Sequence, residues 1–286
     1  MANLKEIRNR IVTVSSTMQI TSAMKMVSAA KLKNPQDAIT AMRPYANKLT
    51  ELLQGLSASL DSDSGSKFSD DREVNKVLVV AITSNRGLCG AFNSNIVKQS
   101  TLLAEETYVG KQLDFMAVGK KGNDILDKKY NVVANHSTVF DDLTFDNVAV
   151  IAEDLMERFT NGSYDRIDIV YNKFKNAATQ IIMSEQFLPI VPIEGTETSN
   201  KDYIFEPSKA KIVEQLIPKS LKTQLYKSIR DSFASEHGAR MTAMHKATDN
   251  ATELRDQLKL TYNKARQAAI TNEILEIVGG AEALNN

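Results

Sequence analysis

The sequence contains no tryptophan, one cysteine and three histidines among its 286 residues, and only 6% of the residues are aromatic. One cysteine cannot form an internal disulfide, and three scattered histidines cannot build a His/Cys metal site. No run reaches the roughly 18 apolar residues that a membrane-spanning helix needs. Acidic and basic residues balance at 35 each, which argues against a generic nucleic-acid binder. A hydrophobic fraction of 42% nevertheless allows one or two folded domains.

The first residues, MANLKEIRNRIV, also lack a targeting signal. They enter a helical pattern directly, without the apolar stretch of a signal peptide or an Arg- and Ser-rich leader. We therefore expect a cytoplasmic address, with any membrane contact being peripheral.

Proline is absent from residues 1–34 and 219–278, and the second stretch holds a single glycine before the Gly-Gly pair at 279–280. Such stretches predict long helices, because proline and glycine are the usual helix breakers. About 60 helical residues span roughly 90 Å, which is longer than a domain of this size is wide. We expect much of this last helix to project from the rest of the chain.

Both proline-free stretches carry apolar seams with alternating steps of three and four residues, the spacing of coiled coils. The first seam consists of Leu4, Ile7, Ile11, Val14 and Met18 and, after a slip in register, Ile20, Ala23, Val27 and Ala30. The last helix offers Met244, Ala247, Ala251, Leu254, Leu258, Thr261, Ala265 and Ala268. The favoured interpretation pairs the two helices antiparallel within one chain. A homodimeric coiled-coil scaffold and two separate amphipathic helices on one core remain alternatives.

Between the helices, the pattern changes to that of an α/β domain. A Ser- and Asp-rich linker covers 57–75, and strands are predicted near 76–83, 113–118, 166–171 and 179–187. Amphipathic stretches near 93–107, 120–129 and 146–160 alternate with them, which predicts a largely parallel sheet covered by helices. We therefore expect an N-terminal helix over 1–56, an α/β domain over 76–205 and a C-terminal helix over 209–286.

The turn TSNRGLCGAFN (83–93) lies where doubly wound folds bind phosphates, between a strand and a helix. Its glycines have the spacing GxxG rather than GxGxxG, and no Walker-type Gly-Lys-Ser/Thr is present. The candidate ribose-binding acids, Glu105 and Glu106, come early and inside a predicted helix. A tight packing turn is the favoured interpretation here and at Gly119–Gly122, and a nucleotide-dependent enzyme is the alternative.

Nothing in the sequence makes a catalytic set. Cys89 would need a nearby base to act as a nucleophile, and the nearest histidine in sequence, His136, lies in a loop. His237 and His245 are eight residues apart on a helix, about 12 Å, which is too far for joint metal ligation. We predict no catalytic, cofactor-binding or metal-binding residues.

Charge and hydrophobicity are unevenly distributed along the two helices. Residues 2–33 hold six basic residues and one acidic residue, a net charge of +5. Such a helix contacts a membrane, a nucleic acid or an acidic protein surface, or is simply solvated. The last helix ends with apolar residues around most of its circumference, namely Ile270, Ile274, Leu275, Ile277 and Val278. If this end projects, we expect a surrounding protein to bury it.

Several segments together resemble the gamma-subunit family of bacterial F-type (rotary) ATP synthases. They are KEIRNRIVTV, ITSAMKMVSAAKL, TSNRGLCGAFN, SEHGARMTAMHKATDNA and YNKARQAAITNEILEIVGGA, with smaller matches at MRPYA, GKKG, VYNKF and EPS. The resemblance runs from about residue 3 to 284.

The resemblance implies a fold of class α/β: a long antiparallel coiled coil of N- and C-terminal helices with a Rossmann-like α/β domain inserted between them. It implies one copy per complex, threaded through a ring of alternating alpha and beta subunits and contacting the epsilon subunit and the c-ring. The chain would carry torque rather than hydrolyse nucleotide, at the cytoplasmic face of the bacterial inner membrane, without nucleic acid or cofactor.

Individual residues can be matched to the family's contacts. Arg266 and Gln267 in NKARQ resemble a catch contact with a beta-subunit loop, where arginine can pair bidentately with a carboxylate. Arg86 in SNRGLCG resembles the residue facing acidic loops of the beta subunits. Met24 and Lys25 in AMKMV lie in the same coupling region.

The apolar end and one proline complete the match. Ile274, Ile277 and Val278 match the part of the family's helix that turns inside a hydrophobic bearing. Pro35 departs from the expected pattern, since it falls where the first helix should continue. It predicts a kink or break near 31–35, because proline removes an N–H and clashes with the carbonyl four residues back.

Overall fold

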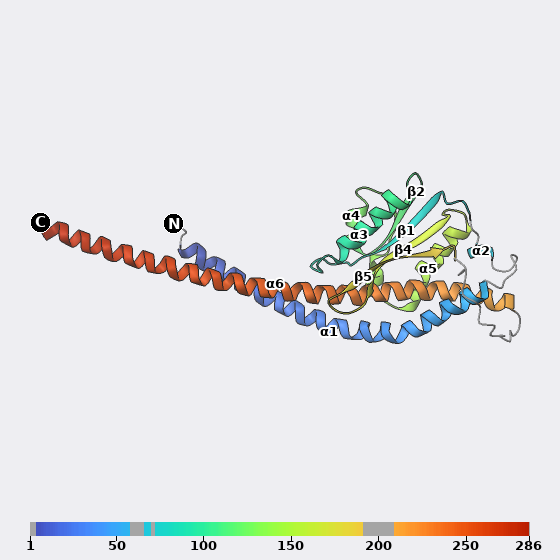
Figure 1. Cartoon of the computed structure of the whole chain (residues 1–286), viewed down its shortest axis with the longest axis horizontal. Helices are drawn as coiled ribbons and strands as arrows, with labels where there is room; N and C mark the ends of the chain where they lie inside the picture. Colours follow the sequence, from blue (N-terminus) through green and yellow to red (C-terminus); the bar gives the residue numbers. More distant parts are fainter. Residues whose placement is uncertain (1–3, 58–65, 70–71, 191–208, 286) are drawn as a thin grey trace. The chain divides into compact units, whose positions relative to one another are not determined.

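The structure is a computed structural model that describes residues 4–57, 66–69, 72–190 and 209–285. The chain divides into two compact units. The helical unit comprises Met1–Ser28 and Met241–Asn286, and the α/β unit comprises Ala29–Arg240. Two long helices, α1 (Leu4–Ser57) and α6 (Lys209–Asn285), contribute to both units (Figure 1). Much of the predicted linker over 57–75 lies outside the described residues.

The α/β unit is built on a five-stranded sheet in the order β3-β2-β1-β4-β5. Four strands are parallel, and β5 pairs antiparallel with β4 at one edge, which confirms the prediction of a largely parallel sheet. The strands are β1 (Lys76–Ile82), β2 (Gln112–Val118), β3 (Val132–Asn135), β4 (Arg166–Phe174) and β5 (Gln180–Leu188). β3 was not predicted from the sequence, because four residues, three of them half-buried and one exposed, are too few to show a periodicity.

Helices cover both faces of this sheet. They are α3 (Phe92–Leu102), continued by a π-helical turn (Leu103–Thr107), α4 (Lys120–Leu126) and α5 (Phe145–Thr160), besides the short α2 (Ser66–Ser69) and a 3-10 turn (Ser137–Phe140). On one face, Leu78 and Val80 of β1 share a core with α5 and with Leu225 of α6. On the other face, Val79 packs with Ile96 of α3. Part of α6 therefore belongs to the core of the α/β unit.

The helical unit is an antiparallel pair formed by parts of α1 and α6. The hydroxyl of Thr248 donates to that of Thr21 at 2.9 Å, and Arg255 Nη1 lies 3.5 Å from Met18 Sδ. Contacts move down α1 as they move up α6, so the two segments run in opposite directions. The predicted antiparallel pairing within one chain is confirmed.

The predicted register slip on α1 is wrong. Ile20 and Val27 are 61% and 55% exposed, whereas Thr21 and Ser28 are buried and continue the three-four spacing after Met18. Small hydroxyl residues allow the partner helix to approach closely, and the Ser28 hydroxyl is satisfied by the carbonyl four residues earlier. The more apolar residues therefore lie on a different, exposed face.

The predicted seam of α6 is right at some positions and wrong at others. Met244 and Ala251 are buried, and Ala247, Leu258 and Ala265 are half-buried, as expected. Leu254, Thr261 and Ala268 are exposed, and the half-buried positions are instead the following residues, Arg255, Tyr262 and Ala269. Long side chains with an apolar stem can cover a helix interface while their polar ends reach water.

Pro35 does not interrupt α1, which continues through both Pro35 and Pro44. The predicted break is therefore wrong, although the ribbon of α1 curves in this part of the α/β unit (Figure 1). Pro35 is buried with Leu32 and Ile39, three and four residues away on the same face. Burial of this face helps to offset the cost of a proline in a helix, about 3 kcal/mol.

Candidate functional site

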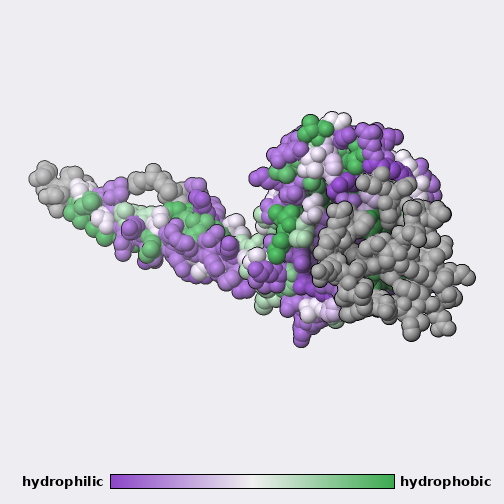
Figure 2. Space-filling model, turned by 45° about the vertical axis from the view of Figure 1, so that its right-hand side comes forward, coloured by the Kyte–Doolittle hydropathy of each residue, from purple (hydrophilic) through white to green (hydrophobic). Residues whose placement is uncertain are grey.

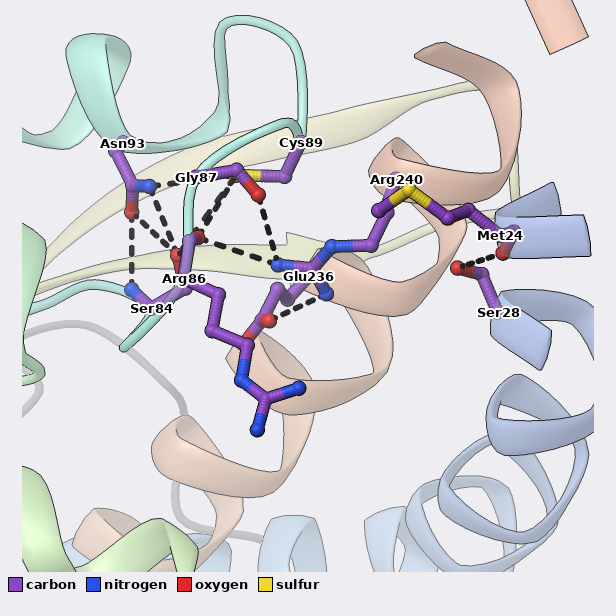
Figure 3. A network of polar contacts seen from close by, with 9 residues as sticks. All are labelled: Met24, Ser28, Ser84, Arg86, Gly87, Cys89, Asn93, Glu236 and Arg240. Carbon is purple, nitrogen blue, oxygen red and sulfur yellow. Dashed lines mark hydrogen bonds and ion pairs between the residues drawn. The ribbon is translucent and has the colours of Figure 1, made fainter. Parts of the chain in front are cut away.

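The turn that follows β1 in the α/β unit is tied together by polar side chains (Figure 3). The backbone N–H of Ser84 donates to Asn93 Oδ1 at 2.9 Å, and Asn93 Nδ2 donates to the Ser84 hydroxyl at 2.8 Å. The same hydroxyl donates to the carbonyl of Arg86 at 2.6 Å. These bonds connect the end of β1 with the first turn of α3.

An ion pair on α6 holds the same turn from the other side. Arg240 Nη2 donates to the carbonyls of Arg86 and Gly87 at 3.2 and 3.3 Å, and Arg240 Nη1 pairs with Glu236 at 2.6 Å. Both side chains of the pair are 10% exposed. Burial raises the pKa of Glu236 above its ordinary value, and the neighbouring Arg240 opposes this shift. The sequence analysis missed this pair, although its i, i+4 spacing in SEHGARM was visible.

In the middle of the turn, the side chains of Arg86 and Leu88 are exposed, while the carbonyls of Arg86 and Gly87 face Arg240. Arg86 and Gly87 are exposed, and Figure 3 shows the Arg86 guanidinium extending away from the bonded network. Leu88 is 64% exposed and has a φ of 63°, a left-handed conformation that leucine seldom adopts. The turn therefore leaves the side chains of Arg86 and Leu88 exposed at the surface of the α/β unit.

This geometry favours the packing-turn interpretation over a phosphate site. Phosphates bind to backbone N–H groups at a helix N-terminus, whereas here an arginine lies against the carbonyls of the turn. In the second glycine motif, a Cβ on Gly119 would lie 2.3 Å from the Thr83 carbonyl oxygen, and one on Gly122 2.7 Å from the Thr83 hydroxyl. These two glycines permit close packing of α4 against the end of β1.

Two titratable side chains beside this network are held in their neutral forms. Cys89 is buried, accepts a hydrogen bond from Asn93 at 3.3 Å, and has its thiol pKa raised by burial. The ring of His237 packs edge-on against Phe233, with centroids 4.7 Å apart. Burial, with smaller contributions from the positive charges of Arg240 and Lys31, lowers the pKa of His237 to about 4.

In the helical unit, the predicted coupling residues of α1 lie beside α6. Lys25 Nζ donates to His245 Nδ1 at 3.3 Å, and His245 also lies 3.5 Å from Asp249. Met24 is half-buried, and its carbonyl accepts a hydrogen bond from the Ser28 hydroxyl. Lys25 therefore already has a contact within the chain that its sequence position did not reveal.

The remaining predicted residues are exposed on the last part of α6, within the helical unit. Arg266 and Gln267 are exposed, and so are the apolar residues Ile270, Ile274, Leu275, Ile277 and Val278. Figure 2 shows hydrophobic residues on the surface of this part of the helix. Exposed apolar surfaces of this kind are typical of interaction sites.

Two further observations concern metals and membranes. Among the described residues, no group of three or more His, Cys, Asp and Glu side chains is placed to hold a metal ion. No helix within 4–57, 66–69, 72–190 or 209–285 is both long and apolar enough to cross a membrane.

Comparisons with known proteins cover nearly the whole chain. A family model described as ATP synthase matches residues 3–284. The chain is 74% identical over 285 residues to the ATP synthase gamma chain of Flavobacterium psychrophilum, covering 99% of each protein. It is 72% identical to the ATP synthase gamma chain of Flavobacterium johnsoniae, covering both proteins completely.

Solved structures show the same fold. A chain in the central stalk and c-ring structure of the Tetrahymena thermophila mitochondrial ATP synthase is 26% identical, with a TM-score of 0.60, covering 80% of this chain and 99% of that one. A chain of the Euglena gracilis mitochondrial ATP synthase is 23% identical, with a TM-score of 0.68, covering 98% of this chain and 94% of that one.

Proposed function

Because the chain belongs to the family of ATP synthase gamma chains, we propose that it is the central rotor shaft of an F-type ATP synthase. It couples ion flow through the membrane sector to conformational change in a ring of alpha and beta subunits. In this proposal, nucleotide chemistry belongs to the ring, and this chain carries torque.

The exposed apolar end of α6 is the observation that supports this function best. Ile274, Leu275, Ile277 and Val278 are each more than half exposed in the helical unit. Apolar side chains around much of a helix are unfavourable in water and favourable inside a protein sleeve. A ring of alpha and beta subunits supplies such a sleeve, in which this end of α6 acts as a bearing.

The polar candidates supply specific contacts to the same ring. Arg266 and Gln267 are exposed and free to reach a beta-subunit loop, where arginine forms a bidentate pair with a carboxylate. Arg86 projects from the α/β unit toward acidic beta-subunit loops, and Met24 and Lys25 belong to the coupling region on α1. The α/β unit contacts the epsilon subunit and the c-ring, which places the complex peripherally at the cytoplasmic face of the inner membrane.

Rotation works through differences in these contacts. A single shaft presents a basic, a polar and an apolar surface to three chemically identical beta subunits, so each beta subunit meets a different face of it. A contact that is stronger in one beta conformation shifts the population toward that conformation. Turning the shaft therefore moves each site through its states in sequence.

Co-purification tests this function. A tagged full-length chain should bring down alpha and beta subunits, and removal of residues 266–286 should weaken assembly or coupling. Recovery of a stable monomer or homodimer without these subunits would contradict the proposal. The homodimer would instead support a coiled-coil scaffold.

Arg266 provides a sharper test within the assembled complex. We expect Arg266→Ala to lower ATPase turnover about tenfold, the equivalent of roughly 1.4 kcal/mol of lost stabilisation. Lys259→Ala is the matched control, because Lys259 is an exposed cation two turns earlier on the same helix face. Equal effects of the two variants, or unchanged turnover in Arg266→Ala, would remove the specific catch contact.

A further inference from the structure

The hydrogen bonds of Arg240 end on the backbone of the turn after β1. Its acceptors are the carbonyls of Arg86 and Gly87, so the bonds fix the path of the main chain between 86 and 88. The direction of the Arg86 side chain follows from that path, because backbone angles determine where each Cα–Cβ bond points. A residue on α6 thus controls the orientation of an exposed side chain about 150 positions earlier.

The turn needs such support because its conformation is strained. Leu88 has a φ of 63°, which is costly for a residue with a Cβ, and its side chain is exposed and gains little from burial. The Ser84–Asn93 hydrogen bonds anchor the beginning of the turn and its return into α3, and the Ser84 hydroxyl also donates to the carbonyl of Arg86. Arg240 bonds to the two successive carbonyls of Arg86 and Gly87 and so ties the middle of the turn to α6.

The geometry uses the fork of the guanidinium group. Nη1 of Arg240 pairs with Glu236 at 2.6 Å, while Nη2 donates hydrogen bonds to the carbonyls of Arg86 and Gly87. A lysine keeps the positive charge but offers one nitrogen, so it cannot reproduce donors at two fixed positions. The side chains of Arg240 and Glu236 are 10% exposed, so water competes little for these bonds.

We propose that Arg240, oriented by Glu236, is a positioning residue that holds the turn after β1 so that Arg86 faces its partner surface. This inference rests on the proposed function, in which Arg86 meets acidic loops of the beta subunits. Arg240 itself need not contact any other subunit. Replacing the Arg240 guanidinium should make the turn more mobile and change the direction of the Arg86 side chain, while the sheet and α6 remain folded.

Cys89 provides a direct probe of the turn, because it is the single cysteine of the chain and is buried beneath it. In the assembled complex, we expect Arg240→Lys to raise the rate of Cys89 alkylation, followed by mass spectrometry, at least tenfold. Arg230→Lys is the matched control, because Arg230 also lies on α6 but contacts Tyr226 instead. An unchanged alkylation rate in Arg240→Lys, or an equal rise in Arg230→Lys, would overturn the proposal.

Turnover of the complex shows whether Arg240 acts through Arg86. If it does, Arg240→Lys lowers ATPase turnover several-fold, and the double variant Arg86→Ala/Arg240→Lys is no slower than Arg86→Ala alone. If the double variant instead shows the product of the two single losses in turnover, the positioning role is overturned. Normal turnover in Arg86→Ala would overturn it as well. An unchanged denaturation midpoint in Arg240→Lys excludes a general loss of stability as the cause.

The two proposals fail in different ways. A chain that recovers no alpha or beta subunits contradicts the rotor function. The alkylation comparison can then be made on the full chain alone, where it still decides whether Arg240 holds the turn.

Discussion

His237 should make the stability of the α/β unit depend on pH. In the folded chain, burial and the nearby charges of Arg240 and Lys31 lower its pKa to about 4. In the unfolded chain, histidine returns to its ordinary pKa of about 6.5. Between about pH 4 and pH 6.5, the folded chain therefore binds fewer protons at His237 than the unfolded chain does. The contribution of His237 to stability is fully present above about pH 6.5 and is lost as the pH falls toward about 4.

The size of the effect follows from this shift. A pKa lowered by about 2.5 corresponds to roughly 3 kcal/mol in the free energy of unfolding. About 2 kcal/mol of this should be lost between about pH 7 and pH 5. Most of the remainder is lost at lower pH, until His237 is protonated in the folded chain as well. Urea unfolding followed by circular dichroism measures this difference directly.

A variant separates His237 from other titrating groups. Neither ring nitrogen of His237 has a hydrogen-bond partner among the described residues, so His237→Met removes no hydrogen bond and retains an apolar contact with Phe233. We expect this variant to lose most of the pH dependence and to remain as stable as the parent at about pH 7. His245→Met, at an exposed histidine of the helical unit, is the control that keeps the dependence. A full pH dependence in His237→Met would refute the reasoning.

Two further substitutions test packing and charge in the α/β unit by denaturant unfolding. Gly119→Ala should destabilise it by about 2–5 kcal/mol, because the new Cβ would lie 2.3 Å from the Thr83 carbonyl oxygen at a φ of +119°, whereas Gly87→Ala meets no atom within 4 Å and should cost far less. Equal losses would contradict the steric argument. Arg43→Met should cost roughly 2–4 kcal/mol, because it leaves the fully buried Asp231 without its ion-pair partner at 2.7 Å, discounted for the partial exposure of Arg43. Adding Asp231→Asn should recover part of this loss by removing the buried charge, and no recovery would argue against an electrostatic cause.

The order of strands and helices could be predicted because each has a length and a period of its own. The apolar runs at β1, β2 and β4 and the amphipathic pattern of α5 were sufficient to predict a parallel sheet covered by helices. Periodicity could not reveal β3, which has four residues, or the continuity of α1 through Pro35. Whether a helix tolerates a proline depends on burial elsewhere along it.

The turn after β1 shows a second limit of sequence reasoning. Its motif and the exposed Arg86 were identified from the sequence, but its support by Arg240 was not. The two residues are 154 positions apart, and only the packing of α6 against the α/β unit brings them together. The i, i+4 spacing of Glu236 and Arg240 is visible in the sequence, but their burial, with both side chains 10% exposed, is not.

The seams of the helical unit show why hydrophobicity alone misplaced the interface. The predicted seam places apolar residues against the partner helix, yet Thr21 and Ser28 are the buried residues and Ile20 and Val27 are exposed. Close helix pairs favour small residues at their contact, and small residues bury little area. Within the described part of this unit, the larger apolar side chains of Ile20 and Val27 therefore remain exposed. The exposed apolar residues of α1 and the exposed apolar end of α6 thus support the proposed function, in which partner subunits cover this unit and add the burial that the seam between its helices does not supply.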